Sequence, residues 1–153
     1  MHIQKTMLLT SVCLVFIVSL PANVIAAPPP PCVFWGVVKL SGANVPMGTT
    51  VTAFVYDSDG QTPIICGAAP TQTYGEDSVY AVNANGDDDA VGGKSGAQEG
   101  DVVHFWIGDG PSRVLAPETG VWRSAASVRV DLSASGSVAP GLRTYLPMIL
   151  RLG

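Results

Sequence analysis

Apolar side chains recur at every second position through most of the chain after residue 32, and this alternation limits the fold more than any other feature. Residues 33–40 read VFWGVVKL, and residues 101–108 read DVVHFWIG, with Val103, Phe105 and Ile107 on one side. A period of two is typical of a half-buried β-strand, and GTTVTAFVY, TPIICG, SVYAVNA and ASVRVDL read as further strands. Turn-forming segments such as DSDGQTP, GDGPS and PETG separate them. The pattern predicts an all-β chain that forms a single antiparallel β-sandwich of six or seven short strands.

The first 26 residues have the layout of a secretory signal peptide. A short basic start containing Lys5 precedes the apolar run TMLLTSVCLVFIVSL, and the small residues of ANVIAA follow it. This order predicts cleavage after Ala26 and a mature chain that is secreted or held at the cell surface. A retained membrane anchor is the alternative, but the apolar run is shorter than the roughly 20 residues that a spanning helix needs.

Composition divides the rest of the chain into one domain with flanking segments. A proline-rich spacer covers residues 27–32, the sandwich 33–133, a small-residue linker 134–141 and an apolar tail 142–153. Without residues 1–26 the chain carries seven basic and twelve acidic residues, a net charge of −5. The basic residues form no cluster, which argues against nucleic acid or an anionic membrane as the partner.

Cys32 and Cys66 are the two cysteines that follow the predicted signal peptide. An exported protein meets an oxidising compartment, where two cysteines allow a single pairing. The sequence therefore predicts a Cys32–Cys66 disulfide that ties the proline-rich entry to a later strand. A reactive or metal-binding pair would need additional ligands, and His104 is the only histidine after residue 26.

The acidic, glycine-rich stretch NGDDDAVGGKSGAQEGD, residues 85–101, raises the question of a bound ligand. A phosphate-binding loop that ends in Gly-Lys-Ser at Lys94 would need glycine at position 88, and the chain has Asp88, so this class of site is excluded. Calcium is the more serious alternative, because oxygen ligands alternate along this part of the chain. The alternating ligands are Asn83, Asn85, Asp87 and Asp89. Since acidic turns also stabilise themselves through side-chain to backbone bonds, we expect a long polar crossover, with calcium as the one cofactor that the sequence suggests.

The sequence carries no arrangement that indicates an enzyme. His104 lies between Val103 and Phe105, so we expect its side chain on the face opposite the core. Neither a Gly-x-Ser-x-Gly nor a His-Glu-x-x-His motif is present, and every acidic residue falls in or beside a turn. We therefore expect a non-catalytic protein.

The tryptophans suggest one kind of ligand. Trp35 and Trp106 alternate with core residues and should point away from the core, and Trp122 falls in the last turn region. Exposed tryptophans on a sheet can stack on sugar rings, which would make the protein a carbohydrate-binding module. In the competing interpretation they pack against each other or under the tail, because tryptophan is mostly buried in proteins.

A succession of four segments carries a resemblance. FWGVVKLSGANVPMGTTVTAFV, YAVNANGDDD, GGKSGAQEGDVVHFWIGDGPSRVLAPETGVW and VRVDLS follow one another along the chain. Their order resembles a β-sandwich module repeated in secreted bacterial and archaeal proteins, similar in build to transthyretin-like, carboxypeptidase-regulatory-like and collagen-adhesin B-type domains. The resemblance implies a prealbumin- or immunoglobulin-like fold and a non-enzymatic surface, adhesion or spacer role in the cell envelope. We expect a cell-envelope protein or a polysaccharide as the partner, and free sheet edges with few lysines also allow self-association.

The C-terminal segment LRTYLPMILRLG is similar to the Tyr-Leu-Pro-apolar-x-Leu-Arg endings of many exported proteins of filamentous phototrophic bacteria. The matching residues are Tyr145, Leu146, Pro147, Leu150 and Arg151. Twelve residues are too few to span a bilayer, and a proline argues against a central strand. Two interpretations stay open: a final edge segment packed on the sandwich, or a sorting or attachment tail.

Overall fold

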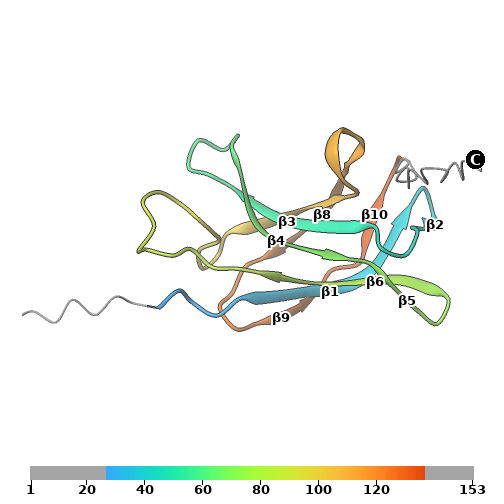
Figure 1. Cartoon of the computed structure of the whole chain (residues 1–153), viewed down its shortest axis with the longest axis horizontal. Helices are drawn as coiled ribbons and strands as arrows, with labels where there is room; N and C mark the ends of the chain where they lie inside the picture. Colours follow the sequence, from blue (N-terminus) through green and yellow to red (C-terminus); the bar gives the residue numbers. More distant parts are fainter. Residues whose placement is uncertain (1–26, 137–153) are drawn as a thin grey trace, which may run out of the picture.

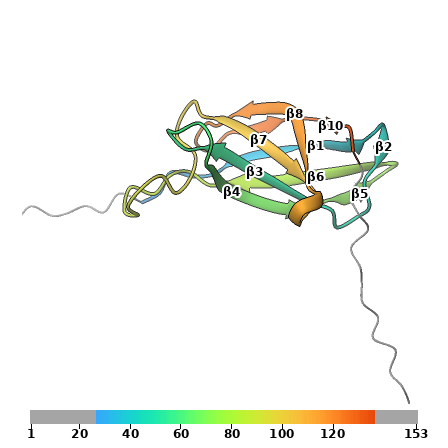
Figure 2. The ribbon, with the colours of Figure 1, turned by 90° about the horizontal axis from the view of Figure 1, so that it is seen from above.

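A computed structural model describes residues 27–136, which form two packed β-sheets (Figure 1). The first sheet contains β1 (Cys32–Leu40), β2 (Ala43–Asn44), β5 (Gln72–Tyr74), β6 (Asp77–Ala84), β9 (Ser127–Arg129) and β10 (Leu132–Ala134). The second contains β4 (Pro63–Pro70), β3 (Thr50–Tyr56), β7 (Val102–Ile107) and β8 (Val114–Val121), side by side in that order (Figure 2). A single 3₁₀ turn, η1 (Gly110–Ser112), interrupts the described strands. The prediction of an all-β sandwich is confirmed.

Three of the predicted segments fall largely or wholly outside these residues. The signal peptide, residues 1–26, and the tail, residues 142–153, lie outside the described part of the chain, as does most of the linker. Between residues 27 and 136, no helix is long and apolar enough to cross a membrane.

Alternation places one side of each long strand in a shared core. Phe34 of β1 and Phe105 of β7 are fully buried and meet edge to face across the two sheets, with 5.4 Å between their ring centroids. Burial of apolar surface is worth about 25 cal/mol per Å², so this shared core is the main source of stability. The largest buried side chains of this core are Trp122, Phe34, Phe105, Ile107 and Leu132.

The end of the sandwich differs from the prediction in detail. The segment ASVRVDL, which reads as one strand, forms β9 and β10, and both pair in parallel with β1 rather than antiparallel. Between them the Asp131 carboxylate accepts the N–H of Val37 (3.0 Å), and the N–H of Val130 donates to the Trp35 carbonyl (2.8 Å). The Asp131 side chain thus takes the place of a backbone acceptor for β1. The predicted single strand is divided into β9 and β10, and the Val37 N–H stays hydrogen-bonded.

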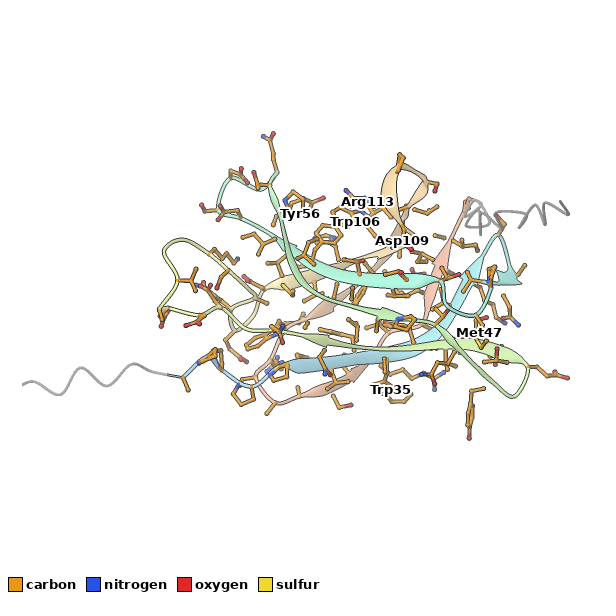
Figure 3. The ribbon with its side chains drawn as sticks, in the orientation of Figure 1. Trp35, Met47, Tyr56, Trp106, Asp109 and Arg113 are labelled. Carbon is orange, nitrogen blue, oxygen red and sulfur yellow. The ribbon has the colours of Figure 1, made fainter. Side chains whose placement is uncertain are left out.

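A carboxylate links the two sheets at one edge. Glu118 of β8 accepts hydrogen bonds from the N–H (3.1 Å) and the hydroxyl (2.6 Å) of Ser133 in β10. β8 is the edge of its sheet, so this contact ties an otherwise free edge to the neighbouring sheet. Each of the two sheets has an outer face, and Figure 3 shows these faces as the upper and lower surfaces of the sandwich.

Candidate functional site

The outer face of the first sheet contains an open hollow of about 490 Å³, called here the Trp35 hollow. Trp35 of β1 lies opposite Ala81 of β6 and beside Arg129 of β9, so the small alanine leaves space next to the indole. The indole is 42% exposed and points away from the sandwich (Figure 3). The side chains that line the hollow include those of Trp35, Tyr74, Asp77, Val79, Ala81 and Arg129.

The side chains of this hollow are held in place by their neighbours. The Trp35 indole N–H donates to the hydroxyl of Ser127 (3.1 Å), and the Arg129 guanidinium carbon lies 5.5 Å from the centroid of the indole ring. Arg129 is itself held by Asp131 through two hydrogen bonds of 3.1 and 3.0 Å. The Arg129 hydrogen bond, together with the Val37 N–H, lowers the pKa of Asp131, so the carboxylate stays ionised and keeps the arginine oriented.

A polar rim surrounds the apolar floor. Asp77 pairs with Lys39 (3.4 Å), and both side chains are about half exposed. Tyr74, on the edge strand β5, is 80% exposed and stands beside the hollow. The site therefore offers two aromatic surfaces, a carboxylate and a guanidinium, which together suit a ligand with an apolar face and hydrogen-bonding edges.

Trp106 occupies a different environment on the outer face of the second sheet. Its ring stacks on Phe54 of β3, with 3.8 Å between centroids and 18° between planes. The guanidinium carbon of Arg113 lies 3.5 Å from the same indole centroid (Figure 3). Two groups so close cannot share one face of the ring, so Phe54 and Arg113 cover opposite faces and leave none for stacking on a sugar.

Trp122 is not a surface residue. It is 1% exposed, and its indole N–H donates to the carbonyl of Ala84 (2.8 Å) in the core. The structure therefore does not bring the three predicted tryptophans together, and it leaves Trp35 as the one with an open face. Tyr74, Asp77 and Arg129, which complete the hollow, were not predicted, because their proximity depends on strand pairing rather than on any local motif.

The acidic stretch is stabilised by its own side chains. The Asp87 carboxylate accepts hydrogen bonds from the Ser95 N–H (2.7 Å), the Ser95 hydroxyl (3.0 Å) and the Gln98 amide (2.8 Å). The Ser95 and Gln98 bonds lower the pKa of Asp87. Within residues 27–136 no group of three or more histidine, cysteine, aspartate or glutamate side chains could hold a metal ion. A calcium site at Asn83, Asn85, Asp87 and Asp89 stays a prediction from the sequence.

Lys94 supplies the positive charge of this stretch. Its ammonium group pairs with Asp101 (2.8 Å) and donates to the carbonyl of Tyr56 (3.3 Å). Both charged side chains are mostly buried, and they line a polar hollow of about 620 Å³ together with Asp57. Lys94 of the Gly-Lys-Ser triplet thus attaches the long crossover to the end of β3.

The predicted disulfide is not present in the structure. Cys32 and Cys66 are both buried free thiols, and the Cys66 thiol points toward the carbonyl of Ile64 (3.6 Å) in its own strand. Burial raises the pKa of Cys66 to about 11. Both side chains belong to the same apolar core, where cysteine packs as a small hydrophobic residue.

His104 packs among aromatic rings. Its imidazole stacks on Phe54 (5.5 Å between centroids) and meets the edge of Tyr56 (5.0 Å), and burial lowers its pKa below the usual value. The ring therefore belongs to an aromatic stripe on the outer face of the second sheet, as its alternation with the core residues predicts.

No protein family matches the chain, and neither does any curated protein or solved structure.

Proposed function

We propose that the chain is a non-catalytic, exported surface module that adheres to its target through the Trp35 hollow. The observation that carries the proposal is a half-exposed, firmly held indole beside Arg129 and Tyr74 in an open hollow. A concave surface with an apolar floor and a few convergent polar groups is the usual form of a ligand site. The signal-like N-terminus supports export.

Polysaccharide is the ligand class that we propose for this hollow. A tryptophan face stacks on the apolar face of a sugar ring, while Asp77 and Arg129 offer an acceptor and donors for hydroxyl groups. A chain with a net charge of −5 after loss of residues 1–26 would repel a polyanion, so a neutral polymer suits it better.

The surroundings of the titratable groups support a binding rather than a hydrolytic role. Glycoside hydrolysis by the common mechanisms uses two carboxyl groups on either side of the scissile bond. Asp77 is the one carboxylate that lines the Trp35 hollow, and it is paired with Lys39. His104 lies on the opposite sheet among aromatic rings.

Retention on insoluble polysaccharides tests the proposal. We expect the chain without its signal peptide to be retained on at least one of three neutral insoluble polymers: cellulose, chitin and a β-1,3-glucan. Trp35→Ala should reduce retention at least tenfold, because it removes the stacking surface. Val91→Ala is the matched control, since this exposed apolar residue lies in the acidic stretch and does not line the hollow.

Two results would contradict the proposal. If the wild-type chain is not retained on any of the three polymers, the module is a spacer or binds protein instead. If Trp35→Ala is retained as well as the wild type, adhesion takes place elsewhere on the surface.

A further inference from the structure

The outer face of the second sheet, called here the aromatic face, consists of apolar, aromatic and threonine side chains. It is formed by the outward side chains of β4, β3, β7 and β8, with Phe54, His104 and Trp106 at its centre. In the described chain these outward strand positions carry no aspartate, glutamate, lysine or arginine. Four of the exposed large hydrophobic residues lie there, each 44–50% exposed. These are Ile65, Val102, Leu115 and Val121.

The charged residues nearest the aromatic face come from the loops at its two ends, and the Arg113 guanidinium extends inward over the Trp106 ring. Arg113 and Asp109 lie in the β7–β8 loop at one end, and Asp57 and Asp59 lie in the β3–β4 loop at the other. Both loops rise above the sheet in Figure 1, so the face lies between two raised ends. None of these four residues forms an ion pair within residues 27–136.

The size of the aromatic face argues against a second copy as its partner. Four strands about 4.8 Å apart and seven residues long cover roughly 14 by 20 Å, or about 300 Å². A stable interface buries about 800 Å² on each partner, so a smaller occupant fits better. A single extended segment is of that size.

The chain leaves the sandwich beside this face. Gly136 is the last described residue, and its N–H lies 3.2 Å from the Ser41 hydroxyl. A Cβ at Gly136 would lie 2.9 Å from the side chain of Val114, the first residue of β8. The next residue of β8 is Leu115, which pairs with Trp106 at the centre of the aromatic face. Because the Val114 side chain packs against the core, the chain continues from the end of the sandwich, at the β8 corner of this face.

The sequence that follows is long enough to cross the aromatic face and has side chains that suit it. Residues 137–141 can span up to about 17 Å, enough to pass round one edge strand, and residues 142–153 extended would reach about 40 Å. The tail contains seven large apolar or aromatic side chains and no acidic one. Its two charges are Arg143 and Arg151.

We propose that the tail, residues 142–153, folds back over the aromatic face of its own domain and covers it. The apolar residues of the tail lie against Ile65 and Leu115. Arg151 then reaches the end that carries Asp57 and Asp59, where opposite charges meet. This inference concerns the face opposite the Trp35 hollow and does not depend on polysaccharide binding.

Limited trypsin digestion of the exported chain, residues 27–153, tests this docking. Trypsin cleaves after Arg143 only when that segment is free, so the wild type should lose residues 144–153 slowly. Leu115→Glu places a charge in the aromatic face and should speed this cleavage at least tenfold. Val91→Glu makes a similar change at an equally exposed residue outside the face, and it should cleave at the wild-type rate.

A second variant separates docking from general unfolding. Leu146→Glu alters only the tail and should also be cleaved at least tenfold faster than the wild type, with an unchanged far-UV circular dichroism spectrum. Equal rates in the wild type, Val91→Glu and Leu146→Glu would overturn the proposal. A concentration-dependent dimer in light scattering that Leu115→Glu abolishes would also overturn it, and would assign the face to a second copy.

Discussion

The Cys66 thiol lies in the core of the sandwich, and burial raises its pKa to about 11. The thiolate is the form that reacts with alkylating reagents, so this group should be unreactive near neutral pH while the fold is intact. Cys32 is fully buried and is protected by exclusion of the reagent.

We expect iodoacetamide to label neither cysteine in the native chain lacking residues 1–26, and to label both after unfolding in guanidinium without reductant. Intact-mass analysis before and after reduction gives the count. No label on the unfolded, unreduced chain would contradict the free thiols of the structure and would support the disulfide predicted from the sequence.

Asp87 lies at the centre of the acidic stretch, and Ser95 and Gln98 occupy its two carboxylate oxygens. We therefore expect millimolar calcium, or a chelator, to leave the melting temperature unchanged within about a degree. Asp87→Asn should lower it in both conditions, because the internal hydrogen bonds weaken. A rise of several degrees with calcium, lost in Asp87→Asn, would restore the predicted calcium site.

The three tryptophans show where residue patterns stop being informative. Alternation correctly predicts that Trp35 and Trp106 point away from the core. It does not show that Arg113 covers Trp106, because the 3₁₀ turn that positions Arg113 forms no periodic pattern. Trp122 lies in a segment that reads as a turn, yet the Ala84 carbonyl satisfies its N–H and allows full burial.

At the level of elements, the strands with clean alternation were predictable and the irregular ones were not. The segments that contain β1, β3 and β7 read directly from the sequence. β8 was missed because PETG reads as a turn. An edge strand tolerates Pro117, since one of its sides needs no backbone donor.

Gly120 of β8 permits the close packing of the two sheets. A Cβ at this position would lie 2.4 Å from the ring of Phe34, which is fully buried against Phe105. We expect Gly120→Ala to destabilise the fold by about 1–3 kcal/mol, the usual cost of overpacking a core. Chemical denaturation measures the change.

Gly92 provides the matched control for this substitution. A Cβ there meets nothing within 4 Å, so Gly92→Ala should leave stability within about 0.5 kcal/mol of the wild type. Equal stability of the two variants would show that Phe34 can move aside and that the glycine is not needed for packing.

For the whole molecule, the two outer faces differ in character. One has a hollow with a polar rim. The other has no charged residue at the outward positions of its strands, and Arg113 reaches over Trp106 from the loop at one end. The sequence predicts that both faces exist, because the alternation leaves one side of every strand outside the core. Their different chemistry follows from which outward residues the strand order brings together, which no local pattern contains.

Removal of the tail tests whether the tail covers the aromatic face. β10 ends at Ala134, so truncation after Gly136 keeps every described strand, whereas a cut after Ser133 would remove part of β10. Burial of one large apolar side chain contributes about 1.5–3 kcal/mol, and ordering the backbone costs about 1–2 kcal/mol per residue. A docked tail should therefore add only a small net stability, and its loss should lower the melting temperature by a few degrees.

A full-length chain with the apolar tail residues replaced by serine is the control and should melt at the same temperature as the truncated chain. A sorting or attachment tail predicts the opposite result, an unchanged melt for both variants, with loss of the truncated protein to the medium.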